Sequence, residues 1–334
     1  MKNKSYIIIL IIFVITSIIL TITTLYFIKK NKITDKDINI AMVIKSMDPS
    51  FKFWQIVKAG AITAKEEYGI NLNISGPWLE SDLSGQKKIL EELIVEKPSA
   101  IILAALDYNA LIPVIEKINF NNIPVITIDS GINSKIPKSF IATDNIEAAE
   151  KLGKFMNNLL SEGDSVAIIS FVKGAASAID REKGVRKAIN ESGKLIIEGS
   201  YYCDNFRDKA SEMTLNIVRN KPNIKGIIAL NDPSTTGAAR AIKKTGLKDS
   251  ILLIGFDNGI EEIEFLEEGI IKALVVQKPF TMGYLSIITA IEVLRKNNVV
   301  SRIDTGSELI TLENMYTQEN QKLLFPLTKE IPVQ

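Results

Sequence analysis

The chain of 334 residues is long enough for two domains, and a hydrophobic content of 46% is ample for a core in each. Lysine and arginine number 40 against 39 aspartate and glutamate, so the net charge of +1 gives no reason to expect a nucleic-acid partner. The sequence has no histidine and only one cysteine. This excludes internal disulfides, Cys-cluster metal sites and histidine-dependent catalytic triads, and we expect no metal and no cofactor.

The first 36 residues contain a long apolar segment. Residues 6–28 carry no charged side chain, and at about 1.5 Å per residue a helix of this length crosses a hydrocarbon core of roughly 30 Å. We expect residues 1–36 to form an uncleaved membrane anchor and a linker. A signal peptide is the alternative, but its apolar region would be about 7 to 15 residues long and would end in small residues. Lysines flank both ends of the segment, so its orientation stays open.

From residue 38 onward, apolar strands alternate with longer segments of helical period. The first series has strands near 39–44, 70–74, 100–105 and 123–129, with helices over 54–68, 82–96 and 109–120. After residue 145 the pattern restarts, with helices over 146–160, 178–191, 207–220 and 235–245 and strands over 165–170, 194–200, 225–230 and 251–255. This alternation predicts two similar α/β domains with parallel sheets. The tail after Asn298 loses the rhythm, and we expect short crossover strands there.

Three of the apolar strands end on a polar side chain. Asp129, Asn231 and Asp257 each follow a run of apolar β-formers. Ligands bind at the carboxyl edge of open α/β sheets, so these residues are candidates for a common site. The alternative is that each one caps the next helix, a frequent role of Asp and Asn after a strand. Three such strand ends in one fold favour the site.

Further side chains have the chemistry that a sugar needs. A sugar offers hydroxyls that donate and accept, and an apolar face of C–H groups, so its site combines carboxylates, amides, a forked arginine and an aromatic ring. Phe53 and Trp54 open the first helix, Arg181 lies at the start of another, and Gln277 follows a short apolar run. Lys45 comes directly after the first strand and is a possible donor.

Each of these residues also has a simpler interpretation. Arg181 is more often a solvated helix residue, and Trp54 at the start of an amphipathic helix can be a core residue. A lysine at a strand end, such as Lys45, usually points to water. Phe171 and Phe206 are predicted to be packing residues. No glycine-rich phosphate loop and no Gly-x-Ser-x-Gly elbow is present, so phosphate cofactors and serine hydrolysis lose support.

An ordered set of motifs resembles a known family, the type I periplasmic sugar-binding proteins of the ribose- and galactose-binding group. The resemblance runs in one register from about Asp37 to Asn297. It rests on Ile40-Ala-Met-Val-Ile-Lys, Phe53-Trp-Gln-x-Val-Lys-Ala-Gly60, Gly76-Pro-x-x-Glu-Ser-Asp82, Ile123-Pro-Val-Ile-Thr-Ile-Asp-Ser130, Ala142-Thr-Asp-Asn145, Asp180-Arg-Glu-x-Gly184, Leu230-Asn-Asp232, Gly255-Phe-Asp257 and Gln277.

This resemblance implies a fold and a non-enzymatic function. Two Rossmann-like lobes, joined by three hinge crossovers, would close on a monosaccharide without making or breaking a bond. The first lobe would comprise residues 37–144 plus 278–303, and the second residues 145–277 plus 304–325. The binding domain would lie outside the cytoplasm, held at the cell membrane by a single-pass anchor.

The resemblance also assigns residues to the ligand. Lys45, Phe53, Trp54 and Asp129 would contribute from the first lobe, and Arg181, Asn205, Asn231 and Asp257 from the second, with Gln277 at the last hinge. Asn205 stands where family members often place an aromatic side chain, so stacking is expected from the first lobe only. Ser130 replaces an arginine that ribose binders carry, which argues against ribose as the ligand.

Two uses of the closed form remain open at this stage. The chain could be the substrate-binding component of a sugar ABC transporter and deliver its ligand to the permease. It could instead dock on a sensor histidine kinase of a two-component system. Lac-repressor-type transcription factors share these lobes, but they carry a helix-turn-helix in about the first fifty residues. This chain has an apolar segment in that place, so DNA binding is not expected.

Overall fold

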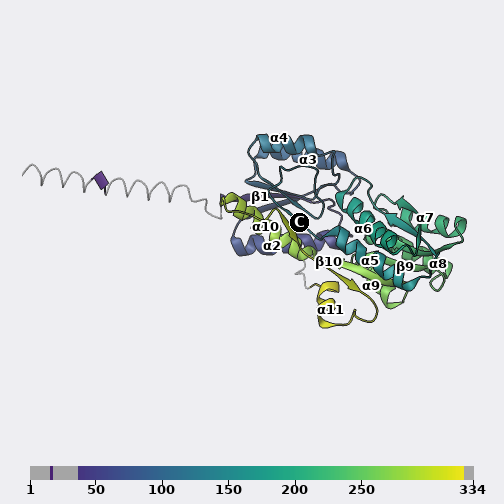
Figure 1. Ribbon diagram of the computed structural model, residues 1–334. Helices are drawn as coiled ribbons and strands as arrows, with labels where there is room; N and C mark the ends of the chain where they lie inside the picture. Colours follow the sequence, from purple (N-terminus) through teal and green to yellow (C-terminus); the bar gives the residue numbers. More distant parts are fainter. Residues whose placement is uncertain (1–15, 18–36, 327–334) are drawn as a thin grey trace, which may run out of the picture.

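The computed structural model describes residues 16–17 and 37–326. The chain forms two bodies, each a sheet covered by helices (Figure 1). The strands are β1 (Asn39–Val43), β2 (Asn71–Ser75), β3 (Ala100–Leu103), β4 (Val125–Ile128), β5 (Phe140–Ala142), β6 (Ser165–Ser170), β7 (Ile196–Tyr202), β8 (Ile224–Ala229), β9 (Leu252–Phe256), β10 (Ile271–Gln277), β11 (Arg302–Asp304) and β12 (Ser307–Ile310). The helices are α2 (Lys52–Tyr68), α3 (Leu83–Glu96), α4 (Ile112–Phe120), α5 (Asn145–Leu159), α6 (Ala176–Ser192), α7 (Arg207–Asn220), α8 (Asp232–Thr245), α9 (Ile260–Glu267), α10 (Pro279–Leu294) and α11 (Gln318–Leu324).

The first sheet has the order β11-β5-β4-β3-β1-β2, and all its neighbouring strands run parallel. Along β1 the side chains alternate between two apolar clusters, with Met42 on one face and Val43 on the other. Both faces are therefore covered, which explains why these strands read as nearly continuous apolar runs. The strand order reverses at β1, and the carboxyl ends on either side of such a reversal form a crevice.

The second sheet has the order β12-β10-β9-β8-β6-β7 and repeats this plan, with β6 at the reversal. Its strands are parallel except for β12, which pairs antiparallel with β10. The helices α5 and α6 approach closely at Gly184, which has no side chain. A Cβ on this residue would lie 2.3 Å from the carbonyl oxygen of Ile146. This contact brings the start of α5 next to the middle of α6.

The chain passes between the two sheets three times. It leaves the first sheet after β5, returns through α10 to β11, and leaves again from β11 to β12. The two-lobed α/β fold with parallel sheets that the sequence predicts is confirmed. The residue boundaries given above for the two lobes remain predictions.

Local differences from the predicted elements have identifiable causes. The helix expected over 109–120 begins at residue 112, because the Asp107 carboxylate accepts hydrogen bonds from the backbone N–H groups of Asn109 and Ala110 and holds a turn there. The helix expected to begin at residue 235 begins at Asp232, because Asn231 caps it. The three-residue strand β5 is too short to produce a recognisable pattern.

The membrane anchor predicted over residues 6–28 lies outside the described residues, apart from residues 16–17. Within the described part of the chain, no helix has the length and apolar composition that a bilayer crossing requires.

Candidate functional site

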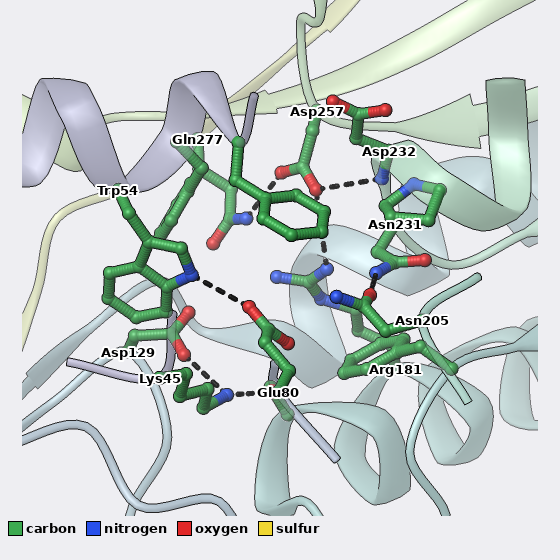
Figure 2. A pocket seen from close by; sticks show the side chains of 15 residues that line it. Lys45, Trp54, Glu80, Asp129, Arg181, Asn205, Asn231, Asp232, Asp257 and Gln277 are labelled. Carbon is green, nitrogen blue, oxygen red and sulfur yellow. Dashed lines mark hydrogen bonds and ion pairs between the residues drawn. The ribbon is translucent and has the colours of Figure 1, made fainter. Parts of the chain in front are cut away.

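A narrow cavity of about 40 Å³ lies between the two sheets and brings the predicted site residues together. Figure 2 shows their side chains converging from both bodies. All nine line the cavity: Lys45, Phe53, Trp54, Asp129, Arg181, Asn205, Asn231, Asp257 and Gln277. Most lie at or just after the carboxyl ends of β1, β4, β8, β9 and β10, so the structure brings these strand ends together at one cavity.

On the side of the first sheet, Lys45 and Asp129 form a buried ion pair. The Lys45 Nζ lies 2.7 Å from an Asp129 carboxylate oxygen, and only 2% of the lysine is exposed. The ammonium also donates to the Ser177 hydroxyl of the second body, at 3.3 Å. The alternative interpretation, in which this lysine points to water, is therefore wrong, because the Asp129 carboxylate at another strand end compensates for its burial.

The aromatic wall comes from the start of α2. Phe53 and Trp54 pack edge to face, with ring centroids 5.0 Å apart, and both line the cavity. The indole Nε1–H donates to the carboxylate of Glu80 at 2.7 Å, in the loop between β2 and α3 (Figure 2). Burial raises the pKa of the Glu80 carboxyl above its usual value, while the positive charge of Lys45 opposes that rise.

Arg181 occupies the second side of the cavity and is 2% exposed. Its Nε donates to the Asn145 side chain at 2.8 Å, and a terminal nitrogen donates to the carbonyl of Leu230 at 2.7 Å. Its guanidinium also lies 4.2 Å from the centre of the Phe256 ring. The solvated-helix interpretation of Arg181 is wrong, since these contacts hold the guanidinium inside the protein.

Asp257 is the carboxylate closest to this guanidinium, at 4.0 Å. It accepts hydrogen bonds from the Gln277 amide at 2.6 Å and from the backbone N–H of Asp232 at 3.2 Å. Burial raises the pKa of Asp257, and the charge of Arg181 works against that shift. The Gln277 side-chain carbonyl oxygen is buried and finds no hydrogen-bond donor among the described residues, so it can accept a hydrogen bond from a ligand.

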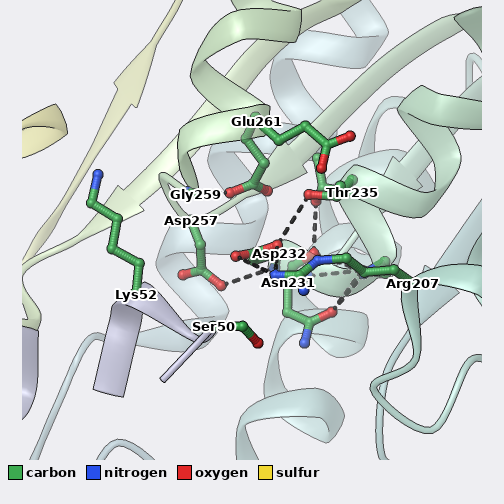
Figure 3. Close-up of polar contacts among 12 residues, drawn as sticks. Ser50, Lys52, Arg207, Asn231, Asp232, Thr235, Asp257, Gly259 and Glu261 are labelled. Carbon is green, nitrogen blue, oxygen red and sulfur yellow. Dashed lines mark hydrogen bonds and ion pairs between the residues drawn. The ribbon is translucent and has the colours of Figure 1, made fainter. Parts of the chain in front are cut away.

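Behind the cavity, the first turn of α8 is held by a polar network (Figure 3). The Asn231 side chain accepts from the backbone N–H of Ser234 and donates to Asn205 at 2.5 Å. Asp232 accepts from Thr236 at 3.0 Å and pairs with Arg207 at 3.2 Å. Asn231 therefore caps a helix and also lines the cavity, whereas Asp129 and Asp257 cap none of the described helices.

The backbone at these strand ends is unusual. Asp129 has φ 57° and Asp257 has φ 81°, in the left-handed region, and Asn205 has φ 66°. Such values are uncommon for residues other than glycine, although Asp and Asn adopt them more readily than most. The left-handed turn ends each strand one residue before its carboxylate and directs the side chain into the cavity. Strained backbone of this kind is frequent at binding sites.

The two bodies also touch directly beside the cavity. The backbone N–H of Tyr108 donates to the carbonyl of Gly174 at 2.9 Å, and that of Ser177 donates to the Ser130 hydroxyl at 3.3 Å. A Cβ on Gly174 would lie 2.0 Å from a carboxylate oxygen of Asp107, so a larger residue here would displace that side chain. The structure is thus a closed arrangement of the lobes.

Six further residues line the cavity that the sequence did not assign to it: Phe51, Glu80, Phe171, Ser177, Asp232 and Pro233. Phe171 was expected only to pack. It does belong to the apolar core of the second body, but it also faces the cavity, 5.7 Å from the Arg181 guanidinium. The second body therefore contributes an aromatic ring after all, from the end of β6 rather than at position 205. Phe206 is not a packing residue, since it is 43% exposed at the outer mouth of the cleft.

The chemistry of the cavity is that of binding. Carboxylates, amides and a guanidinium face aromatic rings, and the described residues contain no cluster of acidic or cysteine side chains suited to a metal ion.

The family model of the periplasmic binding protein domain matches residues 40–298. The chain belongs to this family.

Relatives and solved structures of the same kind match most of the chain. A ribose import binding protein of Haemophilus influenzae is 27% identical over 274 residues, which cover 81% of this chain and 91% of that protein. A sugar transporter structure from Clostridium phytofermentans is 38% identical, with a TM-score of 0.77, and the match covers 82% of this chain and 99% of that one. An ABC transporter solute binding protein from Agrobacterium vitis, with bound D-fucose, is 33% identical, with a TM-score of 0.82 and coverage of 86% and 100%.

Membership of the periplasmic binding protein family explains why the site is shared between the lobes. In a two-lobed binding protein the cleft forms only when both lobes contribute, and here each lobe supplies both a buried cation and a strand-end carboxylate. Because these relatives are solute-binding proteins, the comparisons favour a binding protein over an enzyme.

Proposed function

We propose that the protein binds a monosaccharide in the cavity between its two lobes, outside the cytoplasm, as the substrate-binding component of a sugar ABC transporter. The supporting observation is the convergence of polar and aromatic side chains from both sheets on one cavity. Carboxylates and amides accept from sugar hydroxyls, the Arg181 guanidinium donates to them, and Trp54 offers a flat apolar surface to the C–H face. The names of the relatives, which describe ribose and D-fucose binding, agree with this class of ligand.

In this mechanism the ligand selects the closed form and undergoes no reaction. A sugar that contacts Asp129 in one lobe and Asp257 in the other has its full set of partners only when the lobes are together, so binding shifts the population toward closure. The side chains of the two lobes leave only a narrow space between them. A sugar must therefore enter an opened cleft, and the side chains must rearrange around it.

Isothermal titration calorimetry on the full chain in mild detergent tests the proposal. The panel comprises D-ribose, D-arabinose, D-xylose, D-allose, D-galactose, D-glucose and D-fucose. We expect at least one of these to bind with 1:1 stoichiometry, and Asp257→Ala to weaken that binding at least tenfold through the loss of a buried acceptor. The absence of heat for every sugar up to millimolar concentration would reject the proposal.

We also propose that residues 6–28 tether the protein to the cell membrane, so that the closed form is presented to a permease in the same membrane. The support is the uncharged length of this segment. After cell lysis, the full chain should sediment with membranes and resist a carbonate wash, and release of a shortened chain into the medium would contradict tethering. The relatives described above are import components and binding proteins, and their names give no support to docking on a sensor kinase.

A further inference from the structure

The cavity contains a carboxylate that the strand-end pattern does not account for. Its charged lining residues are four acids and two bases: Glu80, Asp129, Asp232, Asp257, Lys45 and Arg181. Lys45 pairs with Asp129, Arg181 lies beside Asp257, and Asp232 pairs with Arg207 outside the cavity. Among the described residues, no ion pair within 4.0 Å is found for Glu80, which accepts instead from the neutral indole of Trp54.

The position of Glu80 places its carboxylate where a ligand must pass. Glu80 lines the inner cavity and also the larger groove of about 580 Å³ at the mouth of the cleft. In Figure 2 its carboxylate points into the space between the two bodies, with the Trp54 indole on one side. One oxygen accepts from Trp54, which leaves the second free to accept from a ligand.

We propose that Glu80 contacts the sugar and restricts the site to ligands that present hydroxyl donors at this end, so that neutral sugars bind and sugar acids and sugar phosphates do not. This inference rests on the proposed function of the cavity. An ionised carboxylate that is partly removed from water gains from an O–H donor and repels an anion. The charge of Lys45 opposes the rise in the pKa of Glu80 that burial causes, but Lys45 is already paired with Asp129 at 2.7 Å.

The substitution Glu80→Gln tests the charge and keeps the shape. The glutamine carbonyl can still accept from the Trp54 indole, so the aromatic wall should stay in place. A matched control is Glu67→Gln, because Glu67 likewise accepts one side-chain hydrogen bond, from the Tyr284 hydroxyl at 2.6 Å, at an exposed position that does not line the cavity. The unliganded variants should show similar thermal midpoints.

The readout is calorimetry with the best-binding neutral sugar of the panel, and with D-galacturonate, D-glucuronate and D-galactose 6-phosphate. We expect E80Q to weaken binding of the neutral sugar about tenfold at pH 7.5, since a charged acceptor is replaced by a neutral one, and E67Q to leave it unchanged. Wild-type protein should bind none of the anionic probes as tightly as that neutral sugar.

A pH series separates a charge effect from a loss of shape. Burial raises the pKa of Glu80 above that of a free glutamate, so lowering the pH toward 4 should neutralise the wild-type carboxyl and bring its affinity toward that of E80Q. Taking the ratio of the two affinities cancels the titration of the other charged groups around the cavity, which are Lys45, Asp129, Arg181, Asp232 and Asp257.

Three results would overturn the inference while leaving sugar binding intact. The first is an E80Q affinity within twofold of wild type at pH 7.5. The second is an affinity ratio that stays constant from pH 8 to pH 4. The third is a wild-type protein that binds an anionic probe as tightly as the best neutral sugar. A wild-type protein that binds no neutral sugar would instead reject the proposed function itself.

Discussion

Replacing Arg181 by lysine keeps the positive charge in the cavity but removes the planar fork. The guanidinium donates at the same time to the Asn145 side chain and to the Leu230 carbonyl, at 2.8 and 2.7 Å. A lysine has one nitrogen at the end of a flexible chain, so it cannot reproduce both bonds in these directions. We therefore expect R181K to fold, to lose stability and to bind sugar more weakly.

The magnitude follows from the contacts that are lost. One hydrogen bond from a charged donor contributes about 1.5–3 kcal/mol. The wild-type guanidinium also lies 4.2 Å from the centre of the Phe256 ring, and weakening that cation–π contact adds up to about 1 kcal/mol. The total loss of about 2–4 kcal/mol should lower the melting temperature by roughly 3–6 °C for a protein of this size. Binding should weaken at least tenfold, because the donors that face the ligand change position.

Differential scanning calorimetry gives the stability and titration calorimetry gives the affinity. The control is Arg186→Lys on the same helix, where the arginine side chain is 41% exposed, pairs with Glu182 at 2.8 Å and also donates to the Ser200 hydroxyl at 2.8 Å, so that it loses a fork at a site partly open to water. An exposed pair of this kind contributes about 1 kcal/mol or less. We expect R186K to stay close to wild type in both measurements. If R181K also had the melting temperature and the affinity of wild type, the buried network around Arg181 would not exist as described.

Two more perturbations probe the buried charges. Burial, followed by the charges of Asp232 and Asp257, holds the pKa of Glu262 well above its usual value. The folded state therefore binds a proton that the unfolded state releases above about pH 4.3, and stability falls as pH rises from there. Urea unfolding should show E262Q losing less stability than wild type between pH 5 and 8, and parallel pH profiles would contradict this. Lys45→Met should cost about 3–5 kcal/mol at pH 7, since it leaves Asp129 buried without a cation. Adding Asp129→Asn should recover most of that loss, and additive losses would argue against the pair.

The strand-end residues were predictable because the sheet geometry alone brings them together. Parallel strands have their carboxyl ends at one edge, so Asp129, Asn231 and Asp257 needed only an apolar run before them to be recognised. The left-handed backbone at Asp129 and Asp257 was not predictable. Both residues have a positive φ. In a sequence, glycine is the main signal for positive φ, and neither position carries one.

The environment of the charged residues depended on partners that are distant in sequence. Lys45 and Arg181 are buried because Asp129 and Asn145 compensate for them, and the general tendency of such side chains to face water gave the wrong interpretation. Glu80 lies in a loop without periodicity. A signal for it existed, since the loop follows the carboxyl end of β2 at the same edge of the sheet as Asp129.

The threefold passage of the chain means that neither lobe corresponds to one continuous stretch of sequence. β11 completes the first sheet and β12 the second, with only residues 305 and 306 between them. A polypeptide that stopped after α10 would lack an edge strand in both halves at once. Synthesis of nearly the whole chain must therefore precede completion of either half, and a single protease cut between residues 295 and 301 would detach a strand from both.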